Sequence, residues 1–99
     1  MKSSRSSFID AREQARTLAF DALLYLANDL EQLGRFLTET GLDPARLRQA
    51  AKEPSFAGAM LDYLCANESL LVAFAAEQGR DPARIDALRQ MLAQDGSRD

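Results

Sequence analysis

Residues that could do acid–base, nucleophilic or metal chemistry are scarce in this chain of 99 residues. It contains no histidine and a single cysteine, Cys65. Histidine is the usual general base near neutral pH and the commonest metal ligand, so its absence excludes Ser–His–Asp and Cys–His mechanisms. A zinc ion would find one thiolate and otherwise only carboxylates, which is a poor ligand set. We therefore expect no cofactor, no metal and no enzymatic activity.

The few remaining reactive side chains have simpler explanations. Cys65 lies in an apolar run, where a free thiol is most often a buried structural residue. A single cysteine forms no internal disulfide, which is typical of a cytoplasmic protein. Asp21 and Asp62 also interrupt apolar runs, but no other catalytic group accompanies them. We expect each of these carboxylates to mark the solvent-facing stripe of its helix.

Three basic residues, Arg46, Arg48 and Lys52, form a basic island between two acidic stretches. Arg48 and Lys52 are four positions apart and so share one face of a helix. A nucleic-acid-binding surface needs a strongly basic face, and the net charge of −3 argues against one. We expect an ordinary solvated surface here. The alternative is a regulator that uses this local patch to bind nucleic acid.

Two tyrosines and two large apolar side chains are candidates for binding. Tyr25 and Tyr63 are 38 residues apart and occupy matching places in an internal repeat of the sequence, which is described below. This predicts either a pair of rings that packs in the core or a binding pair at the mouth of a groove. Phe20 and Leu24 form a second apolar face on their helix, opposite its core stripe. We expect this helix to be covered on most sides, and this surplus face is the first candidate surface for a protein partner or a second copy.

Gly34 stands inside a predicted helix, where glycine costs about 1 kcal/mol relative to alanine. We expect the backbone of another helix to approach it closely. The alternative is that a partner or ligand touches this point, with Arg35 beside it as an anchor for an anion or a carboxylate.

The elements that position these residues are all predicted to be helices. Alanine and leucine dominate the composition, whereas valine and isoleucine together number three. All three prolines stand where helices begin, and the Asn28-Asp29 pair marks either a break or a point that one continuous helix crosses. The apolar periodicity predicts helices over residues 9–27, 29–40, 44–52, 54–66, 67–78 and 82–93.

The sequence is internally similar when it is aligned with itself at an offset of 38 positions. Residues 17–47 then share 12 identities with residues 55–85, including Gly-x-Asp-Pro-Ala-Arg twice. In this hexad the glycine closes one helix, the aspartate caps the next and the proline takes its first position. We therefore predict a compact all-α bundle of about six helices, built as two pseudo-repeated three-helix units, residues 9–52 and 53–93.

We predict one helical domain over residues 9–94, between a disordered basic, serine-rich tail (1–8) and a frayed tail (95–99). No apolar stretch approaches the roughly 20 residues that span a bilayer, and no targeting segment is recognisable.

Several of these segments resemble a known family. They are residues 19–27 (AFDALLYLA), the LGRFL and TGL elements within residues 33–42, and the LDYL and LL-x-AFA elements after residue 60. Over residues 12–92 the chain is similar to a family of small helical proteins, common in alphaproteobacteria, whose function is unassigned. The family normally has Asp-Pro near residues 28–30, where this chain has Asn28-Asp29-Leu30. The resemblance implies a cytoplasmic α-helical domain and supplies no catalytic residues.

With no catalytic set and with surplus apolar faces, the sequence favours a small non-enzymatic interaction or adaptor module. We expect it to present a groove between its two units, or a helix face, to a protein partner or to a second copy in a homodimer. Binding to nucleic acid is the alternative, and no association with a membrane is expected.

Overall fold

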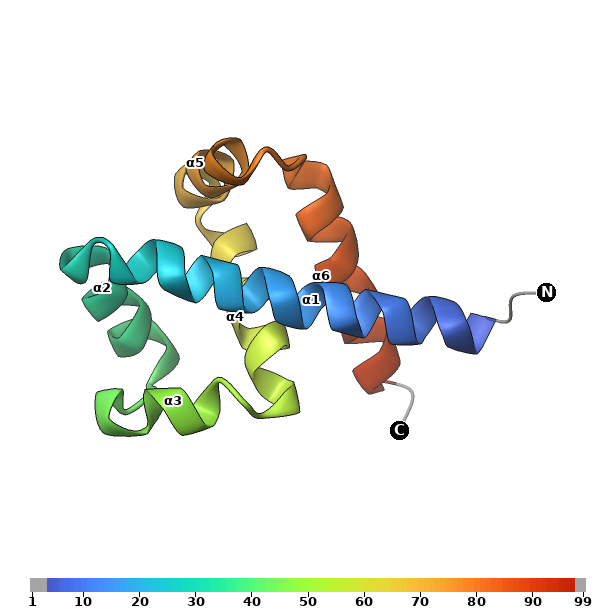
Figure 1. Ribbon diagram of the computed structural model, residues 1–99, viewed down its shortest axis with the longest axis horizontal. Helices are drawn as coiled ribbons and strands as arrows, with labels where there is room; N and C mark the ends of the chain where they lie inside the picture. The colour runs from blue at the N-terminus through green and yellow to red at the C-terminus, as the bar shows by residue number, and fades with distance from the viewer. Residues whose placement is uncertain (1–3, 98–99) are drawn as a thin grey trace.

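The chain folds into helices joined by short turns (Figure 1). The computed structural model describes residues 4–97, and this part contains no strand. The elements are α1 (Ser4–Ala27), α2 (Leu30–Thr40), the 3-10 helix η1 (Pro44–Arg46), α3 (Leu47–Ala50), α4 (Pro54–Ala66), α5 (Glu68–Gln78) and α6 (Pro82–Ser97). The all-α fold class predicted from composition is confirmed.

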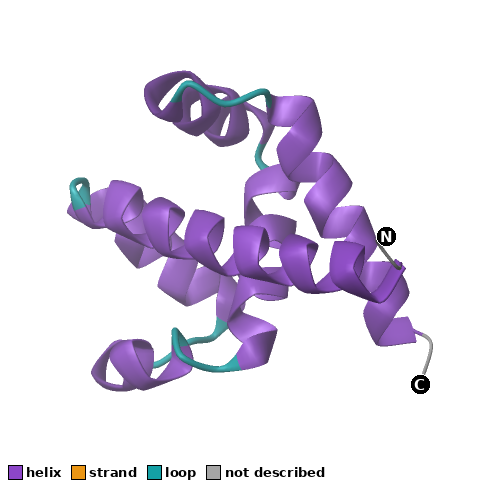
Figure 2. Cartoon of the chain, turned by 45° about the vertical axis from the view of Figure 1, so that its right-hand side comes forward, coloured by secondary structure: helices purple, strands orange, loops and turns teal. Residues whose placement is uncertain are grey.

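The longest helix, α1, lies across the others (Figure 1). It packs against α4, which crosses it, and against α6, while α2 leaves its end at a steep angle and leads to the η1–α3 segment (Figure 1). The η1–α3 segment and α5 lie on opposite sides of the crossed α1–α4 pair (Figure 2). The radius of gyration is 13.5 Å, close to the value of about 13 Å for a compact chain of this length.

The repeated hexad forms the same local structure twice. Gly41 and Gly79 close α2 and α5 with φ of 75° and 66°, a conformation that side-chain-bearing residues rarely adopt. Asp43 accepts a hydrogen bond of 3.0 Å from the amide of Ala45. Asp81 and Ala83 make the matching bond, also at 3.0 Å. The caps predicted from the hexad are confirmed, whereas the duplication of the whole unit stays a prediction.

The break between the first two helices is also confirmed. The chain turns at Asn28, and the Asp29 carboxylate accepts from the amides of Glu31 and Gln32 at 3.1 and 3.4 Å. These bonds satisfy amides that have no partner inside the first turn of α2. A continuous helix through Asn28 is therefore excluded.

The core lies where α1, α4 and α6 meet. Small side chains of α1, among them Ala15, Ala19 and Ala22, are almost fully buried and let the crossing helices approach closely. Phe36 of α2 and Phe74 of α5 are fully buried as well. No polar or charged residue in the described part of the chain is buried. The core is therefore held by apolar packing alone.

Two aromatic contacts link the halves of the chain in a reciprocal way. Tyr25 packs edge-on against Phe74 at 5.4 Å between ring centroids, and Tyr63 packs in the same manner against Phe36 at 5.0 Å. Each contact joins a tyrosine of one half to a phenylalanine of the other, and the two tyrosines and the two phenylalanines are each 38 residues apart. Such reciprocity is typical of a two-fold arrangement.

The helix ends differ from the expected ones. α1 begins at Ser4 rather than near Ile9, because no glycine or proline stops it earlier. α6 continues to Ser97 rather than ending near Ala93. Residues 1–3 and 98–99 of the expected tails lie outside the described residues. In contrast, the predicted helix 44–52 is shorter, since η1 forms its first turn and α3 ends at Ala50.

Three side-chain predictions are wrong. The apolar periodicity of residues 29–40 predicts that Leu30 faces inward, but Leu30 is 78% exposed, because it opens α2 directly after the turn. Asn67 stands first in the predicted helix 67–78, where an asparagine is expected to cap the helix, but its side chain does not cap α5. Its Nδ2 instead donates to the carbonyl oxygen of Tyr63 at 2.7 Å and so closes α4. Cys65 is half-buried rather than fully buried, on the side of α4 that faces α6.

Candidate functional site

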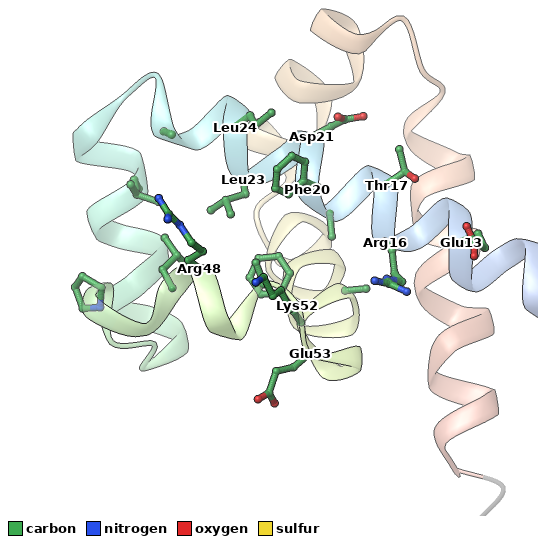
Figure 3. A pocket seen from close by; sticks show the side chains of 18 of the residues that line it. Glu13, Arg16, Thr17, Phe20, Asp21, Leu23, Leu24, Arg48, Lys52 and Glu53 are labelled. Atoms are coloured by element: carbon green, nitrogen blue, oxygen red, sulfur yellow. The ribbon is translucent and has the colours of Figure 1, made fainter.

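A groove of about 1150 Å³ separates α1 from the η1–α3 segment and the start of α4 (Figure 3). Residues from Glu13 to Ala27 form one wall, and residues from Pro44 to Lys52 form most of the other. Phe56 and Ala57 of α4 close the end between them. The groove thus lies mainly within the first predicted unit, and not between the two units as expected.

The exposed apolar side chains of α1 line this groove. Phe20 and Leu24 are 53% and 52% exposed, one helical turn apart on the same face of α1 (Figure 3). The expectation that this helix is covered on most sides is wrong for this face, because α3 ends before it can pack there. Leu33 and Leu47, both half-buried, extend the apolar surface on α2 and α3.

Charged side chains surround the apolar wall. Arg48 and Lys52 approach from the α3 side and Arg16 from α1 (Figure 3). Three acidic residues also line the groove, but none lies free beside Phe20 and Leu24. The Asp21 carboxylate pairs with Arg80 of the α5–α6 turn at 3.5 Å, Glu53 points away from Phe20 and Leu24, and Glu13 lies at the far end of the α1 wall, about two turns before Phe20 (Figure 3). The part of the groove nearest to Phe20 and Leu24 therefore carries positive charge.

The basic island predicted from the sequence is only partly at this groove. Arg46, Arg48 and Lys52 are all exposed, but only Arg48 and Lys52 line it, and Arg46 lies on η1 outside it. Two of the three residues of the island are thus joined to an apolar surface.

Gly34 and Arg35 lie elsewhere, on the exposed face of α2. A Cβ atom added at Gly34 would meet nothing within 4 Å, so the expected close approach of another helix is wrong. Arg35 borders a second hollow, of about 520 Å³, between the first turns of α2 and α5. Neither residue belongs to the main groove.

Tyr25 and Tyr63 line neither hollow. Tyr63 is buried, and this burial, followed by the negative charge of Glu39, raises the pKa of its hydroxyl above the ordinary value. Tyr25 is half-buried on Phe74. The two rings are core residues in this structure, and the alternative of a binding pair at a groove mouth finds no support in their positions.

The remaining reactive groups form a small polar cluster on α4 and α6. Arg89 donates from Nε to the Asp86 carboxylate at 3.0 Å and reaches Asp62 at 3.8 Å. Partial burial and then the charge of Asp86 raise the pKa of the Cys65 thiol, which makes it a weaker nucleophile near neutral pH. Asp21 and Asp62 belong to different ion pairs and do not converge on one point.

Neither a metal centre nor a membrane span is evident in residues 4–97. No group of three or more histidine, cysteine or acidic residues there could hold a metal ion. No single helix is long and apolar enough to cross a membrane; α4 and α5 reach the required length and composition only as a pair, bent by 111° at their junction.

Sequence reasoning identified Phe20, Leu24, Arg48 and Lys52 but missed that they share one groove. It also missed Arg16 and the half-buried Leu47. One signal in the sequence indicates the groove. The helix that follows the first hexad must end before Pro54, whereas no proline interrupts the helix that follows the second, so the first helix is the shorter one.

Comparison with known proteins identifies one relationship. A family model described as "Protein of unknown function (DUF3572)" matches residues 12–95. No curated protein and no solved structure matches the chain.

Proposed function

The chain belongs to the DUF3572 family of proteins of unknown function, and we propose that it is a small, non-enzymatic protein–protein interaction module. Its binding surface is the groove between α1 and α3. The observation that carries the proposal is the exposure of Phe20 and Leu24, two large apolar side chains one turn apart on the wall of an open groove.

Single exposed apolar residues are normal on a protein surface, but several that line one groove together suggest a binding surface. Phe20 and Leu24 adjoin Leu33 and Leu47, and polar side chains surround them. An apolar patch with a polar rim is typical of a surface that another protein covers. Catalysis finds less support, because no convergent set of acid, base and nucleophile lines the groove.

A cytoplasmic partner fits the chemistry of the chain. The free Cys65 has no second cysteine to pair with, which suits a reducing compartment. The partner contributes apolar side chains to the groove, as in other helix-lined recognition sites.

Affinity recovery from the cells that make the protein tests the proposal. The tagged chain is compared with the double variant Phe20→Ser/Leu24→Ser. The matched control is Leu30→Ser/Val72→Ser, which removes two further large apolar side chains, 78% and 49% exposed, away from the groove. Each recovered protein is quantified by mass spectrometry.

We expect at least one protein to be enriched with the native chain and with the control, and to be lost with the groove variant. Equal recovery with the groove variant would contradict the proposal. So would the absence of any protein that the native chain enriches.

A further inference from the structure

The two hexads start helices of different length, and this difference explains the groove. α3 ends at Ala50, whereas α6 continues to Ser97 and packs along α4. In the 38-residue correspondence, Leu47 of α3 matches Ile85 of α6. Ile85, itself a residue of α6, is 1% exposed, but Leu47 is only half-buried and lines the groove. In the second half of the chain, α6 therefore covers α4. At the matching place in the first half, no helix covers α1, and the groove lies there.

The matching faces of α4 and α1 carry different side chains, as expected if α6 covers the first and a helix from outside covers the second. On α4, the positions that match Phe20 and Leu24 are Gly58 and Asp62. Asp62 faces Arg89 of α6 at 3.8 Å, so the seated helix meets a small residue and an ion pair. On α1 the same positions are large and apolar, and they meet solvent. This wall suits a helix that brings its own apolar face from outside.

The charges around the groove indicate what kind of helix would bind there. Arg16, Arg48 and Lys52 surround the apolar wall, and the described residues give none of them an ion-pair partner. Of the acidic residues that line the groove, Asp21 is engaged by Arg80, Glu53 points away, and Glu13 lies at the far end of the wall from Leu24 (Figure 3). Acidic side chains on either side of an apolar stripe would complement this rim.

The geometry points to an acidic amphipathic helix of a partner protein as the occupant of the groove. This inference rests on the proposed function and names the partner's chemistry. The wall from Glu13 to Ala27 is about 21 Å long at 1.5 Å per residue, so the occupant has about four turns. Its apolar residues recur at i, i+3 or i+4, and i+7, with Asp or Glu beside them.

A second copy is the competing occupant. α5 carries acidic residues at both ends, Glu68 and Glu77, and Val72 exposes part of its outer face. Its outward apolar side chains are short, however: besides Val72 they are Ala73 and Ala76. They fill less of a groove of about 1150 Å³ than the long apolar side chains of a partner helix would. The structure therefore favours a partner.

Fluorescence anisotropy with two labelled synthetic peptides tests the inference. Both are 16-residue helices with the same leucine stripe, and one has glutamate and the other lysine at the flanking positions. The full chain is titrated into each at low and at high salt. We expect the glutamate peptide to bind at least about tenfold more tightly than the lysine peptide, and this preference to shrink at high salt.

Charge reversal locates the preference. Arg48→Glu/Lys52→Glu should reverse the order of the two peptides. The control Arg46→Glu/Arg84→Glu makes the same change in net charge outside the groove and should leave the order unchanged. Phe20→Ser/Leu24→Ser should weaken both peptides by about tenfold or more.

Four results would overturn the inference. Equal binding of both peptides would remove the role of the basic rim. Loss of binding on charge reversal, without any effect of Phe20→Ser/Leu24→Ser, would indicate a polyanion site, such as one for nucleic acid. A dimer in sedimentation that Phe20→Ser/Leu24→Ser dissociates would assign the groove to a second copy. If neither peptide binds while affinity recovery still depends on Phe20 and Leu24, the occupant is not an acidic helix, although the interaction module stands.

Discussion

At the scale of single residues, exposure separates the positions that hold the fold from those that are free for function. Phe36 and Phe74 are fully buried, whereas Phe20 is 53% exposed. Aromatic side chains lose the most when they stay in water, so a half-exposed phenylalanine on a groove contributes little to folding. Gly34 is a further position that the fold does not need as it is, because no neighbour approaches it.

Replacing Gly34 with alanine should therefore stabilise the protein. Glycine inside a helix costs about 0.5–1 kcal/mol relative to alanine, and a new Cβ here meets open space. We expect Gly34→Ala to raise the free energy of unfolding by that amount and the Tm by about 4 °C. Gly41→Ala is the control, because φ of 75° disfavours a side chain there, and it should cost about 1 kcal/mol. A loss of stability in Gly34→Ala, measured by urea unfolding, would show that the glycine has a structural role.

Alkaline pH should destabilise the protein through Tyr63 and Cys65. Burial raises the pKa of both groups in the folded chain, so the unfolded chain loses these protons at a lower pH. Their contribution to stability is complete below the unfolded pKa values and falls as the pH rises above about 8. We expect the free energy of unfolding to drop between about pH 8 and pH 11, and less steeply in Tyr63→Phe and in Cys65→Ala. Slopes unchanged in both variants would refute this assignment.

At the scale of elements, local signals were predictable and tertiary placement was not. The caps at Asp29, Asp43 and Asp81 were visible because each makes hydrogen bonds within three residues. Leu30 was misplaced because apolar period alone does not say which face another helix covers. The groove depends on where the short α3 lies relative to α1, and no periodicity contains that information.

The alanine stripe of α1 should be intolerant of larger side chains. Ala15 is fully buried where α1 packs against its neighbours. Ala15→Leu must push a helix aside, and we expect it to cost about 1–3 kcal/mol. Gln14→Leu places the same side chain on the exposed face one residue earlier, and should change stability by less than about 0.5 kcal/mol. Equal effects of the two substitutions, measured by thermal or urea unfolding, would mean that α1 does not pack as described.

At the scale of the whole molecule, the two halves of the chain contain similar helices that play different roles. In the second half α6 covers α4 and completes the core, and in the first half the short α3 leaves α1 open. The fold class and the surplus apolar face of α1 could be predicted from sequence, but their union with Arg48 and Lys52 in one groove could not. We propose that the protein meets another protein at this groove.

Site-specific photo-crosslinking in the cells that make the protein tests whether the groove is the binding surface. A photoreactive benzoylphenylalanine is placed at Leu24 in the groove or, as a control, at Val72 on α5. We predict a discrete covalent adduct to a protein from the Leu24 position, lost when Phe20→Asp is added, and none from the Val72 position. An adduct that forms only at Val72, or the absence of any adduct at Leu24, would contradict the assignment of the groove as the binding surface.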